Sequence, residues 1–205
     1  SITLIVVVAV FSFFWDGLSM LTSTADSYSD VFVYNQIDGS RSIKFSNNFG
    51  DFLPKNSSWS PGWEVKAAKL DNDEFTDFFL YNKTNGQWFK SVYDDSGEFT
   101  YNNGTWSPDW ETYVLDLNGD GLSDVFLYNR SIGYWFKCLN VSGQDGFSCG
   151  QRGQWDPGWQ IYPVRLNTDS LDDLFLYNQG SGVWFRAVNE IADNFNLTQG
   201  NYWSP

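Results

Sequence analysis

The stretch Asp116-Leu-Asn-Gly-Asp-Gly-Leu-Ser-Asp124, followed directly by Val125-Phe-Leu-Tyr-Asn129, decides how the rest of the chain is organised. Its first nine residues place oxygen-bearing side chains at alternate positions, which turns them toward a common centre, and glycines stand where a tight turn needs positive φ. The apolar residues that follow are typical of a buried strand. The stretch therefore predicts a cation-binding loop that leads into a strand.

The strand part of this stretch recurs with a regular period. Copies of the pattern Asp-x-Phe-x-Tyr-Asn are spaced 47, 47 and 49 residues apart, starting at Asp30, Asp77, Asp124 and Asp173. A tryptophan motif keeps step with it, as Trp59-Ser-Pro-Gly-Trp63, Trp106-Ser-Pro-Asp-Trp110, Trp155-Asp-Pro-Gly-Trp159 and Trp203-Ser-Pro205. A period of this length indicates a modular repeat. We divide the chain into an arm at 1–15 and a repeat domain at 16–205, with copies 16–62, 63–109, 110–158 and 159–205.

Each copy is expected to form four short strands, which make one blade. In the second copy we place them at Glu64–Leu70, Phe78–Asn82, Gln87–Tyr93 and Glu98–Tyr101, separated by turns rich in Asp, Asn, Ser and Gly. The sequence thus predicts an all-β, four-copy β-propeller-like fold. The aromatic residues expected to fill the space between blades are Phe79, Tyr81 and Trp88 with their counterparts Phe126, Tyr128, Trp135, Phe175, Tyr177 and Trp184.

Composition argues against several classes of function. The formal net charge of −13 is unsuited to nucleic acid, which is bound by clustered Lys and Arg. Histidine is absent, so the commonest general base and the commonest ligand of transition metals are missing. No pair of carboxylates stands apart from the repeat pattern as a catalytic pair would. We therefore expect no enzymatic activity.

The loop 116–124 followed by Val-Phe-Leu-Tyr resembles the FG-GAP/VCBS repeat, the blade unit of integrin-type and related lectin-like β-propellers. The resemblance covers about 190 of the 205 residues. It implies a calcium ion in this loop, bound by the side chains of Asp116, Asn118, Asp120 and Asp124 and by the carbonyl of Leu122.

The other three loops keep only part of this ligand set. Their first ligand position holds Thr22, Lys69 or Arg165, while the later aspartates persist as Asp26 and Asp30, Asp73 and Asp77, and Asp169 and Asp173. A cationic side chain repels calcium and neutralises aspartates by a charge-assisted contact. We expect one calcium site, in the third copy, with Lys69 and Arg165 replacing the ion in copies two and four. The alternative for every loop is an Asx turn without metal.

Cysteines and sequons indicate an extracellular or cell-surface location. Cys138 and Cys149 lie on neighbouring predicted strands, where they form either a disulfide or two unpaired buried thiols. Six Asn-x-Ser/Thr sequons favour a glycosylated, secreted chain, with chance matches in an Asn- and Ser-rich sequence as the alternative. They start at Asn56, Asn82, Asn103, Asn129, Asn140 and Asn196.

The arm at 1–15 is an almost continuous apolar run, too short for a transmembrane span. It suits a buried strand, added either to the chain's own sheet or to a neighbouring subunit in a head-to-tail polymer, or an apolar helix in a fibre core. Burial within its own subunit is the alternative without assembly. The residues expected to mediate assembly are Ile2, Leu4, Val6, Val8, Val10, Phe11 and Phe13.

Two functional hypotheses follow. The first is a non-enzymatic structural protein, a glycosylated subunit of an extracellular filament or matrix assembled through the arm. The second is a calcium-stabilised adhesion module that binds carbohydrate or another protein. The tryptophan motifs bear on the second, because sugar faces stack on exposed aromatic rings, although packing between blades is the expected role of these residues.

Overall fold

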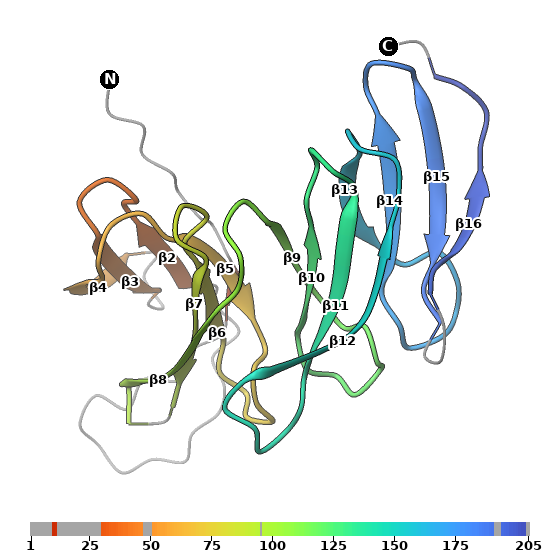
Figure 1. The fold of residues 1–205 in the computed structure, drawn as a ribbon. Coiled ribbons are helices and arrows are strands. Elements are labelled where there is room, and N and C mark those ends of the chain that lie inside the picture. Colours follow the sequence, from red (N-terminus) through yellow and green to blue (C-terminus); the bar gives the residue numbers. More distant parts are fainter. Residues whose placement is uncertain (1–9, 12–29, 47–50, 95, 191–193, 204–205) are drawn as a thin grey trace. The chain divides into compact units, whose positions relative to one another are not determined.

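The computed structural model describes residues 10–11, 30–46, 51–94, 96–190 and 194–203. These residues are all β-structure and turns, with no helix. They divide into two compact units, which we describe separately: residues up to 82 with 87–104, and residues 83–86 with those from 105 onward. Each unit contains two four-stranded antiparallel sheets (Figure 1). The expected all-β class is confirmed, and a closed ring of blades is not shown.

The strands run in simple up-and-down order within each sheet. Sheet 1 comprises β1 (Val10–Phe11), β2 (Asp30–Tyr34), β3 (Ser40–Ser46) and β4 (Phe52–Ser58). Sheet 2 comprises β5 (Glu64–Ala68), β6 (Asp77–Tyr81), β7 (Gln87–Tyr93) and β8 (Phe99–Thr105). Sheet 3 comprises β9 (Glu111–Leu115), β10 (Asp124–Tyr128), β11 (Tyr134–Asn140) and β12 (Phe147–Gln154). Sheet 4 comprises β13 (Gln160–Val164), β14 (Asp173–Asn178), β15 (Val183–Val188) and β16 (Asn196–Gln199).

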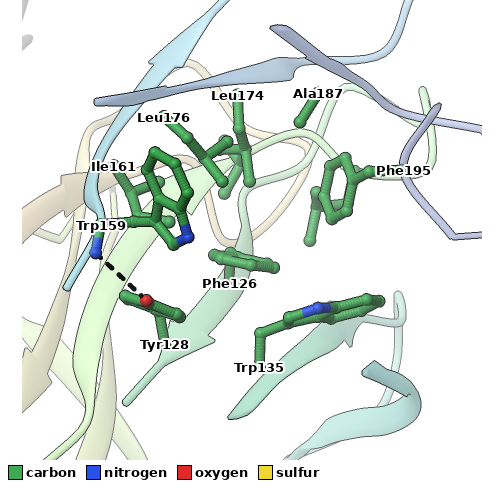
Figure 2. Packing of buried hydrophobic residues seen from close by; sticks show 11 residues of the cluster. Phe126, Tyr128, Trp135, Trp159, Ile161, Leu174, Leu176, Ala187 and Phe195 are labelled. Atoms are coloured by element: carbon green, nitrogen blue, oxygen red, sulfur yellow. Dashed lines mark hydrogen bonds between the residues drawn. The ribbon is translucent and has the colours of Figure 1, made fainter. Parts of the chain in front are cut away.

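The second strand of each sheet forms the centre of the packing. Both faces of β10 are buried, because successive residues of a strand point to opposite faces and both faces carry apolar side chains. In the second unit, Phe126 and Tyr128 of β10 pack toward Leu174 and Leu176 of β14 (Figure 2). Phe32 and Tyr34 of β2 pack in the same way toward β6 in the first unit. Phe126, Tyr128 and Trp135 therefore fill the space between paired sheets, as expected, whereas Phe175, Tyr177 and Trp184 of sheet 4 are only half-buried.

A glycine at the end of the turn between the second and third strands of each sheet anchors the tryptophan motif. Gly133 has φ of 79° and donates to the carbonyl of Asn129, and its own carbonyl accepts the N–H of Trp155 at 3.0 Å. A Cβ on Gly133 would lie 1.8 Å from the carbonyl oxygen of Trp155. Only glycine satisfies both the positive φ and this close approach.

The last strand of sheet 2 is longer than its sequence indicates. The run Asn102-Asn103-Gly104 has the composition of a turn, but β8 continues through it to Thr105. A Cβ on Gly104 would lie 2.3 Å from the ring of Trp88, so the glycine is there to admit the indole and not to turn the chain. Gly153 has the same relationship with Trp135 in sheet 3.

The second tryptophan of each motif packs inside its unit. Trp159 is buried and meets Phe185 edge-on, with ring centroids 5.4 Å apart. Its backbone N–H donates to the hydroxyl of Tyr128 at 3.3 Å (Figure 2). That hydroxyl in turn donates to the carbonyl of Asp156 at 3.1 Å. The motif is thus a packing device, while its first tryptophan remains half-buried.

Sheet 1 departs from the pattern at Arg41, which stands where the other sheets carry tryptophan. Its guanidinium carbon lies 4.6 Å from the ring centroid of Trp59 and 4.7 Å from that of Phe99. A cation–π contact therefore occupies the place of an aromatic one. Burial lowers the pKa of this guanidinium.

Candidate functional site

The third loop folds around its own side chains. Asp116 accepts the backbone N–H groups of Asn118 and Gly119 through Oδ1, and that of Gly121 through Oδ2. Asn118 Oδ1 accepts from Asp120 N at 3.0 Å, and its Nδ2 donates to Asp120 Oδ2. The oxygens at 116, 118 and 120 thus all turn into the loop, as the alternation predicts, and they form Asx-type turns in the structure.

Asp124, the last residue of the loop, has a different environment. Its side chain is fully buried and its two oxygens accept the N–H groups of Leu117 and Asn140, at 2.8 and 2.7 Å. Burial raises the pKa of this carboxyl to about 7, against the lowering effect of both hydrogen bonds. Asp124 therefore joins the loop to the end of β11.

The same junction recurs in loops that lack the full calcium-ligand set. Asp77 accepts the N–H groups of Leu70 and Tyr93, at 2.6 and 2.9 Å. Asp173 accepts those of Leu166 and Asn189, at 2.7 and 2.8 Å. Since both loops begin with a cationic residue, a backbone-bonding role explains why this aspartate recurs, without any metal.

The expected charge neutralisation in the fourth loop involves a different carboxylate from those predicted. Arg165 Nε lies 3.0 Å from Oδ1 of Asp172, not beside Asp169 or Asp173. The other oxygen of Asp172 accepts the N–H of Asp116 at 2.8 Å, and Asp172 N donates to the carbonyl of Asp116 at 2.7 Å. Arg165 thus supports the contact between the third and fourth loops.

Buried Asn189 holds these two loops together. Its Nδ2 donates to the carbonyls of Leu117 and Asp172, at 2.9 and 3.1 Å. Its Oδ1 accepts from Lys137 Nζ at 2.7 Å, and that ammonium also lies 4.4 Å from the ring centroid of Phe195. Both the nitrogen and the oxygen of the Asn189 side-chain amide have hydrogen-bond partners, as a buried polar side chain requires.

The side chains of the third loop are of the kind that calcium prefers, but in the structure they are engaged in hydrogen bonds within the loop. Carboxylate and amide oxygens at 116, 118 and 120 are hard ligands of the kind that calcium takes. In the structure these oxygens accept hydrogen bonds from loop amides. Of the predicted ligands, Asp116, Asn118, Asp120 and the Leu122 carbonyl are the groups that would hold the ion, after exchange of these amide bonds for metal contacts. The fifth, Asp124, has both carboxylate oxygens bonded to the backbone.

A groove lies beside the tryptophan motif in each unit. In the second unit it has a volume of about 540 Å³ and is lined by Gln154, Trp155, Asp156, Pro157, Trp159, Leu176, Phe185 and Leu197. In the first unit it has a volume of about 210 Å³ and is lined by Trp59, Ser60, Trp63, Leu80, Phe89 and Tyr101. Both grooves open to solvent between the motif of one sheet and the strands of the next.

The two grooves are built from equivalent positions of the repeat. Trp59, Trp63, Leu80 and Phe89 of the first correspond to Trp155, Trp159, Leu176 and Phe185 of the second. They differ at the rim: Tyr101, whose hydroxyl accepts from Trp59 Nε1 at 2.9 Å, is replaced by Leu197. The sequence contained all of these residues, but it did not reveal that packing of the second tryptophan leaves the first one beside an open groove.

Cys138 and Cys149 form a disulfide between β11 and β12. They are opposite each other in the strand register, at an irregularity that begins after Lys137. The disulfide confirms the first of the two alternatives given above. It joins the edge strand β12 of sheet 3 to its neighbour β11.

The six sequons occupy three kinds of position. Asn56, Asn103 and Asn196 are exposed on β4, β8 and β16, the last strands of their sheets. Asn82 and Asn129 are half-buried at turns, where Asn129 Oδ1 accepts from the backbone and hydroxyl of Ser131. The sixth, Asn140, is 1 % exposed, so the fold shields its side chain from modification.

Two of the predicted assembly residues lie within the described part of the chain. Val10 and Phe11 form β1, which pairs antiparallel with Val31 and Asp30 of β2. These two residues thus belong to the first sheet, although the sequence pattern assigns them to the arm at 1–15. Ile2, Leu4, Val6, Val8 and Phe13 lie outside the described residues.

No protein-family model matches the chain, and comparison with curated proteins finds no significantly similar sequence. No helix that is both long and apolar enough to cross a membrane occurs in the described ranges.

Proposed function

We propose that this chain is a non-enzymatic, extracellular binding module that takes up carbohydrate in the grooves beside its tryptophan motifs. The observation that carries the proposal is the recurrence of one aromatic groove at equivalent positions of two separate units. If the first tryptophan of the motif served packing alone, we would expect it to be covered, whereas Trp59 and Trp155 are both half-buried beside a groove.

The lining of the grooves favours a neutral sugar. Trp155 and Phe185 offer half-buried ring surfaces, against which the apolar face of a pyranose stacks. Gln154 and Asp156 add hydrogen-bonding groups at the rim, as a specific site requires. An anionic ligand is disfavoured by the charge of −13.

Calcium is part of this proposal as a stabiliser of the third loop. The ion would bind Asp116, Asn118 and Asp120, which supply two carboxylates and one amide oxygen within a nine-residue loop. Because this loop contacts the fourth through Asp172, calcium would hold the pair of sheets that form the second groove.

A glycan array probed with the full chain, followed by titration calorimetry with the sugar that binds best, tests the proposal. Tyr101→Ala and Leu197→Ala alter exposed rim residues of the two grooves, and Tyr134→Ala is a matched control because Tyr134 is similarly exposed but lines neither groove. We expect each rim variant to weaken one site at least tenfold and the control to bind normally. Absence of binding to any glycan, or equal binding by all variants, would contradict the proposal.

A second candidate function, a structural subunit of an extracellular filament, is supported by the edge of sheet 1. Strand β1 is an edge strand of sheet 1, and a strand edge accepts an added strand. Electron microscopy of the full chain and of a variant lacking residues 1–9, which keeps β1, tests this candidate. Filaments that form equally with and without these residues would contradict assembly through the arm.

A further inference from the structure

Sheet 4 presents an aromatic surface that its counterpart in sheet 3 keeps buried. We define the aromatic quartet of sheet 4 as Phe175, Tyr177, Trp184 and Trp203. The first three are half-buried and Trp203 is 51 % exposed. At the equivalent positions of sheet 3, Phe126, Tyr128 and Trp135 are at most 1 % exposed.

The exposed quartet has the same internal geometry as the buried one. Ring centroids of Phe175 and Trp184 are 5.6 Å apart, compared with 5.8 Å for Phe126 and Trp135. Trp203 lies 5.5 Å from Phe175 and 5.3 Å from Trp184, and the corresponding separations from Trp155 in sheet 3 are 5.7 and 5.4 Å. The surface is thus organised for packing before anything covers it, which reduces the entropic cost of docking.

The structure also shows what covers such a quartet. In the second unit, Leu174 and Leu176 of β14 and the edge of Phe195 pack on the rings of sheet 3 (Figure 2). The occupant is therefore the opposite face of another sheet of the same repeat. A contiguous, partly exposed patch of four large aromatic rings is a mark of an interaction site.

Sheet 1 carries the matching face. By the repeat alignment, Val31 and Val33 of β2 occupy the positions of Leu174 and Leu176 in β14. These valines alternate with Phe32 and Tyr34, which pack on sheet 2, so they lie on the other face of sheet 1, where they are half-buried.

A basic side chain flanks the quartet as it does in sheet 3. Arg186 is exposed and corresponds to Lys137, which is buried because it donates to Asn189 and Glu190 of the following sheet. Arg186 is therefore positioned to bond polar groups of a docked sheet.

We propose that the aromatic quartet of sheet 4 is the docking surface for sheet 1 of a second copy of this chain, so that copies associate head to tail. The contact pairs two different surfaces and leaves one of each free, which allows open polymers. This inference rests on the filament function proposed above, and it adds a contact between sheet faces to the strand addition at the edge of sheet 1.

Sedimentation velocity of the full chain over a range of concentrations, with two complementary variants, tests the inference. Trp203→Ala damages the quartet and leaves sheet 1 intact, while Val33→Lys places a charge on the docking face of sheet 1 and leaves the quartet intact. Tyr202→Ala is the control, because Tyr202 is 70 % exposed and adjacent to the quartet without belonging to it. Circular dichroism verifies that each variant is folded.

We expect concentration-dependent polymers from the wild type and the control, at least tenfold weaker association of either variant alone, and dimers when the two variants are mixed, because one intact surface remains on each partner. Polymers of Trp203→Ala as long as those of the wild type would overturn the quartet as the docking surface while leaving assembly itself intact. A wild-type chain that stays monomeric at all concentrations would overturn both this inference and the filament function.

Discussion

Asp124 Oδ1 accepts the backbone N–H of Asn140 at 2.7 Å, across sixteen residues of sequence. The same bond joins Asp77 to Tyr93 and Asp173 to Asn189. In each case the second carboxylate oxygen accepts an N–H from the preceding loop. One buried aspartate in each of sheets 2, 3 and 4 thus fixes the preceding loop to the end of the third strand, and it does so whether or not the loop carries calcium-type ligands.

This arrangement predicts a particular pH dependence of stability. Burial raises the pKa of Asp77 to about 7 from its ordinary 3.8. The folded state therefore binds the carboxyl proton of Asp77 more tightly than the unfolded state does. The contribution of Asp77 to the free energy of unfolding is then greatest below about pH 4 and declines toward pH 7, by at most ~1.4 kcal/mol per pH unit.

Denaturant unfolding of the wild type and of Asp77→Asn between pH 4 and pH 7 measures this effect. We expect the stability advantage of the wild type over the variant to shrink as the pH rises. Asp145→Asn, at an exposed position, is the control and should show a constant difference. A difference for Asp77→Asn that stays constant or grows with pH would show that this carboxyl is ionised throughout.

The glycine that supports the tryptophan motif should tolerate no side chain. Gly133→Ala combines a positive φ with a Cβ 1.8 Å from the carbonyl oxygen of Trp155, so the backbone must shift. Gly143→Ala has a similar φ of 77° with no atom within 4 Å of the new Cβ. We expect about 1 kcal/mol of destabilisation from Gly143→Ala and at least ~2 kcal/mol more from Gly133→Ala, measured by chemical denaturation. Equal destabilisation by the two variants would mean that the tryptophan motif shifts at no cost in free energy.

Calcium is expected to stabilise the chain through the third loop. Saturation at about 100 times the dissociation constant would add roughly 2.7 kcal/mol to the free energy of unfolding. Thermal unfolding with calcium and with chelator should differ for the wild type but not for Asp116→Asn. Asp71→Asn alters the second loop and should keep the full calcium response. A response that persists in Asp116→Asn would place the ion elsewhere.

Glycosylation is expected to follow the exposure of the sequons. Mass spectrometry of glycopeptides, after secretion from a host with N-glycosylation, should find glycans on Asn56, Asn103 and Asn196 and none on Asn140. The three exposed residues lie on the last strands of their sheets, so a glycan there adds no clash with the core. Full occupancy of Asn140 would require that modification precedes folding of β11.

The sequence predicted the elements well because their signals are local. The alternation in Asp-x-Phe-x-Tyr, the turn residues and the repeat period together place the second and third strands of sheet 2 within one residue. The fourth strand was harder to place, because Gly104 has the composition of a turn and is required by the indole of Trp88, a partner distant in sequence.

The candidate sites were only partly predictable. The Asp116–Asp120 alternation showed which oxygens face the loop, but the burial of Asp124 and the pairing of Arg165 with Asp172 depend on contacts between strands and between loops. The grooves depend on how far each tryptophan is covered by the next sheet. A repeat pattern gives equivalent positions, and burial of those positions is decided only when the sheets pack.

Calorimetric titration of the full chain with the best sugar from the array tests the central claim most directly. We expect two sites per chain, and we expect Tyr101→Ala and Leu197→Ala each to weaken one of them at least tenfold while the affinity of the other site stays unchanged. Affinities that neither variant alters would contradict the assignment of the grooves as carbohydrate sites.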